Sequence, residues 1–278
     1  MQLNFVKTNP SGNTTIFIID PIPRRFQAAV ANKIMKPTSI GAEQVGFVER
    51  PVSKAAIARL QMAGNEFCGN ATRAFAAWLV HTKFPGIALG VNKQDFTVPV
   101  EVSGCDELLS ALVSVQYSDA GSKEIQVGLP MPLPQSITEK TSSNGDRYTL
   151  VIFDGIVHAV LWDFLPSEAH FQEIKSDINC HISPFECLGV MYYDTKRQYL
   201  TPLVYVEQVN SLVWESSCGS GTVAVAAALA QRKQHSINCL CLHQPGGKLE
   251  VSIEWDGKIK QAAIKGDVSI AAQGQVYL

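Results

Sequence analysis

The sequence lacks the features that would assign a protein to a membrane, a secretory route or a nucleic acid. No apolar run approaches the length of a membrane-spanning helix, and residues 1–7 include no charged segment leading into a long apolar one. Charged residues make up only 17% of the 278 residues and the net charge is −2, so no polyanionic partner is indicated. Basic patches with interleaved aromatic residues are also missing. We therefore expect a cytoplasmic globular protein that binds neither membrane nor nucleic acid.

Cysteine occurs in an odd number and without Cys-x-x-Cys spacing. Seven cysteines in a chain of this size argue against a disulfide framework. Two loose Cys/His clusters lack the spacing of a zinc site and are interpreted as structural: Cys180, His181 and Cys187, and Cys239, Cys241 and His243. No lysine sits in a recognisable pyridoxal-phosphate motif. The sequence therefore predicts no metal and no cofactor.

The chain does contain one motif twice. Residues 64–74 read GNEFCGNATRA and residues 214–222 read WESSCGSGT, each followed by an apolar, Ala-rich run. These runs predict buried helices, which places Cys68 and Cys218 at helix N-termini. There the N–H groups and the helix dipole stabilise a thiolate and can hold a carboxylate. A lone buried cysteine is ordinarily a small hydrophobe, but the repetition favours a reaction at the α-carbon of an amino acid.

Segments with strand character surround both motifs. We predict helices at 25–35 and 167–176, and strands at 3–7, 15–19, 44–49, 56–62, 95–102, 107–115, 148–153, 156–162, 188–193, 199–206, 211–214, 238–243, 247–255, 258–264 and 268–277. The Pro-rich residues 129–134 indicate an extended linker or edge segment. The two Cys-Gly motifs lie 150 residues apart (218 − 68), about half the chain, which suggests two copies of one α+β unit. We expect one domain at 1–117 plus a C-terminal strand at about 267–278, a second at 118–266, and a site in the cleft between them.

These motifs resemble those of the cofactor-independent amino-acid racemases and epimerases with the diaminopimelate epimerase fold. That family carries Cys-Gly-Asn in one domain and Cys-Gly-Thr/Ser-Gly in the other, and an N-terminal Gly-Asn segment similar to Gly12-Asn13. Within it, the chain resembles the histidine racemases of opine-metallophore (staphylopine-type) biosynthesis at residues 9–13, 43–47, 64–72, 102–105, 214–222 and 243–247. The resemblance implies an α+β fold of two pseudo-symmetric domains, each a mostly antiparallel sheet or barrel around a central apolar helix. It also implies a homodimer that makes D-histidine for a metallophore.

Inverting an α-carbon without a cofactor needs a base on one face and an acid on the other, which a thiolate and a thiol can supply. We expect Cys68 and Cys218 to fill these roles. In addition to the two cysteines, the candidates for binding the substrate are Asn13, Glu43, Gln44, Gly69, Asn70, His158, Glu215, Gly219 and Ser220. The glycine-containing helix starts would face the carboxylate, on which negative charge develops. Other interpretations stay open for five of them: Asn13 as a turn residue, Glu43 as an exposed charge, Gln44 as a solvent-facing strand residue, and His158 and Glu215 as partners of nearby backbone.

Departures from the epimerase pattern bear on the substrate. Diaminopimelate epimerases carry an arginine shortly before the second cysteine and an asparagine in a Gly-Asn-Pro-His segment, where this chain has Ser216 and Ile156. A second charged amino-acid group would therefore lack its partners, while Glu43 and Glu215 could meet an imidazole. The alternatives are epimerisation of another amino acid, and a non-catalytic binding module on the same fold, which the two cysteines disfavour. A further alternative is the isomerase branch of the same fold, which uses a single acidic base. That branch lacks the cysteine pair, so Cys68 and Cys218 disfavour it.

Overall fold

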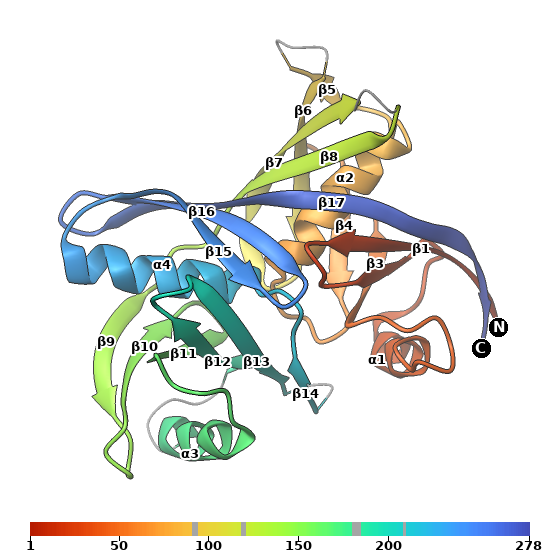
Figure 1. Cartoon of the computed structure of the whole chain (residues 1–278). Helices are drawn as coiled ribbons and strands as arrows, with labels where there is room; N and C mark the ends of the chain where they lie inside the picture. Colours follow the sequence, from red (N-terminus) through yellow and green to blue (C-terminus); the bar gives the residue numbers. More distant parts are fainter. Residues whose placement is uncertain (91–93, 118–120, 180–184, 208–209) are drawn as a thin grey trace. The chain divides into compact units, whose positions relative to one another are not determined.

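The computed structural model describes residues 1–90, 94–117, 121–179, 185–207 and 210–278. The chain forms two compact units, one made of Met1–Pro130 with Lys265–Leu278 and the other of Met131–Ile264 (Figure 1). The domain boundary was expected between residues 117 and 118, and residues 118–120 lie outside the described residues. Cys180 and His181 of the first Cys/His cluster also lie outside the described residues.

The first unit contains two helices and most of its strands in sequence order. Its elements are β1 (Gln2–Pro10), β2 (Thr15–Ile18), α1 (Arg24–Ile34), β3 (Gln44–Glu49), β4 (Ala58–Met62), α2 (Gly69–His81), β5 (Ala88–Leu89), β6 (Asp95–Val102), β7 (Cys105–Tyr117) and β8 (Lys123–Pro130). The last strand of the chain, β17 (Ile259–Tyr277), begins in the second unit and ends in this one.

The strands of the first unit pair in a closed ring. The order is β1-β2-β3-β4-β6-β7-β8-β17, and β17 pairs with β1 again; β2–β3 and β4–β6 are parallel. Helix α2 packs against β1, β2, β6, β7 and β8. Every residue from Gly69 to Val80 is buried, as expected of a helix that is apolar on all sides. Phe75 stacks on Trp78 and meets Phe17 of β2 edge to face, with ring centroids 5.8 and 5.6 Å apart.

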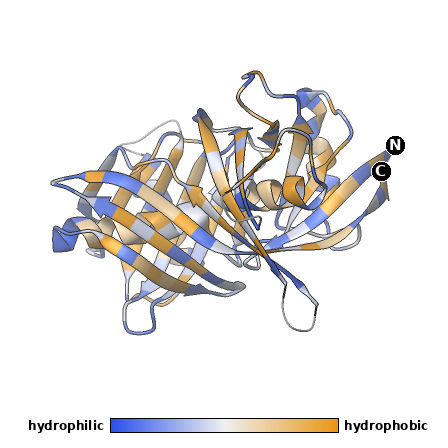
Figure 2. Ribbon diagram, turned by 90° about the horizontal axis from the view of Figure 1, so that it is seen from above, coloured by the Kyte–Doolittle hydropathy of each residue, from blue (hydrophilic) through white to orange (hydrophobic). Residues whose placement is uncertain are grey.

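Helix α1 covers the other face of the β1–β3 layer. Its buried residues Val30, Ala31 and Ile34 pack with Phe5, Ile16, Ile18 and Phe47, whereas Phe17 points to α2. The side chains of a strand alternate between its two faces, and Figure 2 shows hydrophobic and hydrophilic residues alternating along the strands. In β2, by contrast, all four residues are buried, because this strand packs against α1 on one face and α2 on the other.

The second unit repeats this plan. Its elements are β9 (Ser136–Thr141), β10 (Arg147–Ile152), β11 (Ile156–Trp162), α3 (Glu168–Asn179), β12 (Cys187–Asp194), β13 (Tyr199–Val206), β14 (Ser211–Trp214), α4 (Gly219–Lys233), β15 (Ile237–Gln244) and β16 (Gly247–Trp255). Helices α3 and α4 lie on opposite faces of the β10–β13 layer (Figure 1), and α4 also packs against β15 and β16. Along β11, Val157, Ala159 and Leu161 face α3, so that His158, between two of them, points to α4.

The predicted α+β class with an apolar helix at the centre of each unit is confirmed. Three strands, β5, β8 and β9, were not predicted, and the segments expected at 258–264 and 268–277 form the single strand β17. β5 has only two residues, and β8 and β9 flank the Pro-rich residues 129–134, which the sequence suggested to be a linker or edge segment. Among the described residues, no helix is both long and apolar enough to span a bilayer.

Candidate active site

Cys68 is the N-cap residue of α2. Its φ of −129° lies in the extended region, and the Ala71 N–H donates to its Sγ at 3.3 Å. The first intrahelical bond runs from the Thr72 N–H to the Cys68 carbonyl at 2.9 Å. The N–H groups of Gly69 and Asn70 therefore belong to the helix N-terminus, which favours negative charge. The predicted helix start is present at Cys68.

The tight turn between β6 and β7 holds the segment that leads into Cys68. Ser103 Oγ donates to the Glu66 carbonyl at 3.0 Å and accepts from the Met62 N–H at 2.9 Å. Gly104 has a φ of +66°, and a Cβ at this position would lie 2.2 Å from the Phe67 nitrogen. This close backbone approach requires glycine. The turn accounts for one of the family-like motifs, at residues 102–105, to which the sequence assigned no role.

Three other predicted residues form two hydrogen-bonded pairs, one of which includes Cys68. The Cys68 Sγ donates to Gln44 Oε1 at 2.9 Å, and the Asn13 amide donates to Glu43 Oε2 at 2.7 Å. Because Gln44 directly follows Glu43, the two pairs are neighbours on the chain. An amide side chain can accept from a thiol through its oxygen or donate to a thiolate through its nitrogen. Gln44 can thus serve Cys68 in both protonation states.

A buried arginine lies behind the same helix start. Arg73 has no solvent exposure, and its Nη2 donates to Asn70 Oδ1 at 2.8 Å and to Ser11 Oγ at 3.4 Å. Its Nε and Nη1 have no hydrogen-bond acceptor among the described residues. Burial lowers the pKa of Arg73 to about 10, and the nearby Cys68 and Asp267 oppose this lowering. The guanidinium therefore stays charged at neutral pH.

Cys218 is the N-cap residue of α4, with a φ of −126°. The Thr222 N–H donates to its carbonyl at 3.0 Å, and the Thr222 hydroxyl does so at 2.6 Å. The buried Gln244 clamps this turn: its Oε1 accepts from the Cys218 N–H at 2.7 Å, and its Nε2 donates to the Thr222 hydroxyl at 2.9 Å. Gln244 comes from the family-like motif at residues 243–247, so that this motif shapes the second helix start.

The environment of the Cys218 thiol favours its protonated form. Burial and the Glu215 carboxylate raise the pKa of Cys218 well above its usual value, and a hydrogen bond to Glu215 adds to this effect. The Gly221 backbone and the Ser220 hydroxyl, 3.7 Å from Sγ, act in the opposite direction. The sequence predicted a thiolate-stabilising helix start at both cysteines, but at Cys218 burial outweighs it.

His158 contacts Ser220 of this half-site. Its ring is fully buried, and Nε2 lies 2.9 Å from Ser220 Oγ. Burial lowers the pKa of His158 to about 4, against a smaller opposing effect of the Gly189 backbone, so the imidazole is neutral at pH 7. A Cβ at Gly189 would lie 2.3 Å from its Nδ1. This packing fixes the ring and thereby orients the Ser220 hydroxyl.

The predicted site residues thus fall into two half-sites, one in each unit. Asn13, Glu43, Gln44, Cys68, Gly69 and Asn70 belong to the first, and His158, Glu215, Cys218, Gly219 and Ser220 to the second. Sequence reasoning missed Arg73 and Gln244. A charged residue inside an otherwise apolar helical run could have pointed to Arg73, and the motif at 243–247 to Gln244.

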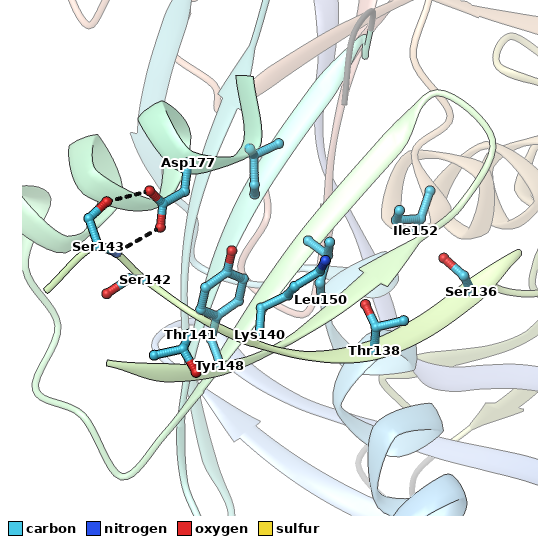
Figure 3. A pocket seen from close by; sticks show the side chains of 11 residues that line it. Ser136, Thr138, Lys140, Thr141, Ser142, Ser143, Tyr148, Leu150, Ile152 and Asp177 are labelled. Carbon is cyan, nitrogen blue, oxygen red and sulfur yellow. Dashed lines mark hydrogen bonds between the residues drawn. The ribbon is translucent and has the colours of Figure 1, made fainter. Parts of the chain in front are cut away.

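A metal site requires several ligating side chains close together. Across the ranges that the structure describes, no group of three or more His, Cys, Asp or Glu residues is placed to hold a metal ion. A pocket of about 600 Å³ opens elsewhere in the second unit, beside β9, β10 and α3 (Figure 3). Asp177 at its rim accepts from the Ser143 hydroxyl at 2.6 Å. None of the residues that line this pocket is a predicted site residue.

Comparison with known proteins shows which family the chain resembles over its whole length. The family model described as "Histidine racemase CntK N-terminal domain" matches residues 2–277. A histidine racemase of Staphylococcus aureus (strain Mu50) is 30% identical over 287 residues, covering 99% of this chain and 98% of the relative. One from Fusobacterium nucleatum subsp. nucleatum is 33% identical over 282 residues, covering 99% and 97%. The structure of a probable proline racemase from Agrobacterium radiobacter K84 is similar in fold, with a TM-score of 0.73, 14% identity and coverage of 99% and 93%.

Proposed function

The chain belongs to the histidine racemase family, and from this we propose that it interconverts L- and D-histidine without a cofactor, using Cys68 and Cys218 as paired base and acid. The observation that carries the proposal is the repetition of one helix start, with a cysteine at the N-cap and a threonine four residues later, in both units. An amino-acid racemase that holds no cofactor needs two groups able to exchange roles, and two such cysteines supply them.

In the proposed reaction, a thiolate takes the α-proton while the other cysteine delivers the proton of its thiol from the opposite side. The negative charge that develops on the substrate carboxylate is stabilised by the N-termini of α2 and α4. Gly69 and Asn70, with Gly219 and Ser220, are the residues of these two helix starts. After inversion the thiolate and thiol have exchanged positions, so both directions are served.

We propose that Glu43 recognises the imidazole. Its carboxylate is already oriented by the Asn13 amide, and it precedes Gln44, the partner of the Cys68 thiol. Glu215 is engaged with Cys218 and holds it as a thiol. Diaminopimelate has a second charged group, and the arginine and asparagine that epimerases use for it are replaced here by Ser216 and Ile156. Burying such a group unpaired costs several kcal/mol.

The test is α-proton exchange in deuterated water with a panel of amino acids. L- and D-histidine should both exchange, whereas alanine, proline and diaminopimelate should exchange slowly or not at all, because buried polar groups left unpaired discriminate by as much as about 10⁴-fold. A chelator should have no effect, and the absorbance spectrum should lack a pyridoxal band. Comparable kcat/KM for diaminopimelate would assign the chain to general epimerisation, and no exchange with any amino acid would leave a binding module.

We further propose that the product D-histidine is used for an opine metallophore and that the enzyme works as a cytoplasmic homodimer. The support is the resemblance of the motifs at residues 9–13, 43–47 and 243–247 to the racemases of that pathway. Light scattering of the purified protein tests the dimer, and a monomer at assay concentration would rule it out.

A further inference from the structure

The two helix starts share the cysteine, the following glycine and the threonine four residues after the cysteine, but they differ in their charged residues. Aligned on the cysteines, Thr72 corresponds to Thr222 and Asn70 to Ser220, whereas Arg73 corresponds to Val223 and Asn65 to Glu215. One cysteine therefore has a cation five residues after it, and the other has a carboxylate three residues before it. This difference lies at the reacting thiols, where charge decides which one is ionised.

We propose that Arg73 is a positioning residue that makes Cys68 the thiolate and Cys218 the thiol of the resting enzyme. The inference rests on the proposed two-cysteine function and adds an order to it. Its geometric basis is a guanidinium with no solvent exposure, directed into the first turn of α2 through its 2.8 Å bond to Asn70.

A buried guanidinium needs a negative partner. Two nitrogens of Arg73 have no acceptor among the described residues, and an uncompensated buried charge is strongly destabilising. Ionised Cys68 and Asp267 are the two anions that favour its charged form. Coupling between two charges is reciprocal, so Arg73 favours the Cys68 thiolate to the same extent. Asp267 is solvent-exposed and accepts from the Gln126 amide at 3.2 Å, which leaves Cys68 as the more buried partner.

Two further carboxylates have to be weighed against Arg73, because one precedes Gln44, the partner of Cys68, and the other lies two residues before Cys68 in the sequence. The Glu43 carboxylate accepts a hydrogen bond from the Asn13 amide, and this bond partly compensates the negative charge of Glu43. Glu66 is buried two residues before Cys68. Burial favours the neutral form of a carboxyl group and of a guanidinium group, but an arginine retains its charge far more readily. We therefore expect the positive charge of Arg73 to outweigh the two carboxylates in its effect on the Cys68 thiol.

The order has a consequence for turnover. When the Cys68 thiolate takes the α-proton and the Cys218 thiol gives up its own, the enzyme is left with a thiol at Cys68 and a thiolate at Cys218. That state places an anion beside Glu215 and removes one from Arg73. Return of a proton from Cys68 to Cys218 through solvent or through the reverse reaction then restores the resting enzyme.

The experiment is alkylation of the full chain by iodoacetamide without substrate, from pH 5.5 to 10, with mass-spectrometric quantification of Cys68 and Cys218. Only a thiolate reacts, so the midpoint of each rate–pH curve reports ionisation independently of access. In the wild type the Cys68 midpoint should lie at least about one pH unit below that of Cys218, a tenfold difference in thiolate fraction. A Cys218 midpoint equal to or below that of Cys68 would overturn the proposal.

The variants test the part played by Arg73. Arg73→Met should raise the Cys68 midpoint by about one pH unit and leave that of Cys218 unchanged, while Arg73→Lys, which keeps the charge, should restore most of the difference. Arg24→Met, an exposed arginine of the same unit, should move neither midpoint, and Glu66→Gln should lower that of Cys68. An unmoved Cys68 midpoint in Arg73→Met would refute the role of Arg73.

Failure of this proposal can be distinguished from failure of the proposed function. If circular dichroism shows that Arg73→Met does not fold, the order of the two alkylation midpoints in the wild type and in Arg73→Lys still tests the proposal. Because alkylation needs no amino acid, an absence of histidine exchange with the order intact would count against the proposed function alone.

Discussion

Replacing Gly104 by alanine perturbs the Cys68 half-site from a position that contacts no substrate in the proposed mechanism. The new Cβ would lie 2.2 Å from the Phe67 nitrogen and 2.7 Å from the Glu66 carbonyl carbon. Both contacts are backbone atoms, which cannot rotate away as a side chain can. To reach even 3.0 Å, the Phe67 nitrogen must retreat by about 0.8 Å, and Cys68 is the next residue.

The cost has two parts. An L-residue in the left-handed region costs about 1–2 kcal/mol, and the added methyl group against a packed backbone costs about 1–3 kcal/mol more. A substitution at Gly257 distinguishes the backbone cost from the steric cost. Its φ of +67° is nearly that of Gly104 at +66°, but a Cβ at Gly257 would meet nothing within 4 Å. Gly257→Ala should therefore show the backbone cost alone.

The assays are thermal unfolding and histidine α-proton exchange on both variants. Gly104→Ala should unfold several degrees below Gly257→Ala and lose about 10²-fold in kcat, since displacement of a reacting group by about 1 Å has an effect of that order. Gly257→Ala should keep wild-type kcat. If the two variants have the same unfolding midpoint and the same kcat, the turn does not hold the Cys68 segment and the reasoning is wrong.

Three further outcomes are expected. Cys68→Ser and Cys218→Ser should each abolish racemisation while circular dichroism stays unchanged, because a hydroxyl is a far weaker acid than a thiol; near-normal turnover in either would exclude the two-base scheme. The pKa of His158 is about 4 in the folded chain and 6.5 when unfolded, so its contribution to stability, at most about 3 kcal/mol, is fully present above pH 6.5 and is lost as the pH falls towards 4. His158→Asn should flatten the dependence of the urea midpoint on pH in that window, and an unaltered slope would contradict the assignment. Gln244→Ala removes the buried bonds to the Cys218 N–H and to α4, so it should cost about 1–3 kcal/mol and reduce exchange, whereas Gln273→Ala, at an exposed glutamine, should do neither.

The core of each half-site was predictable because its signals are local. A Cys-Gly turn before an Ala-rich run specifies a helix start within ten residues, and both helices begin at the glycine after the cysteine. The pairing of Cys68 with Gln44 joins residues 24 apart in the sequence. A contact between residues so far apart depends on the tertiary structure and cannot be read from sequence spacing. Gln44 was identified as a site residue through the resemblance of the motif at residues 43–47.

What escaped prediction depends on long-range packing. Arg73 belongs to the motif at residues 64–74 but received no role, because nothing in the sequence shows that Asn70 and Ser11 accept hydrogen bonds from its guanidinium. Residues 258–277 were predicted as two strands, 258–264 and 268–277. In the structure, burial continues to alternate through Ala262, Ile264, Gly266 and Val268, so β17 passes straight through.

The course of β17 sets an order on biosynthesis. Residues 268–277 pair with β1 along nearly its whole length and complete the ring of strands around α2. A ribosome produces these residues only after it has made the entire second unit. The second unit can therefore fold while the chain is still growing, whereas the N-terminal unit, although made first, waits with an open edge at β1 until β17 emerges. During translation, the ring of strands around α2, the helix that begins after Cys68, is thus closed only after the second unit has been made.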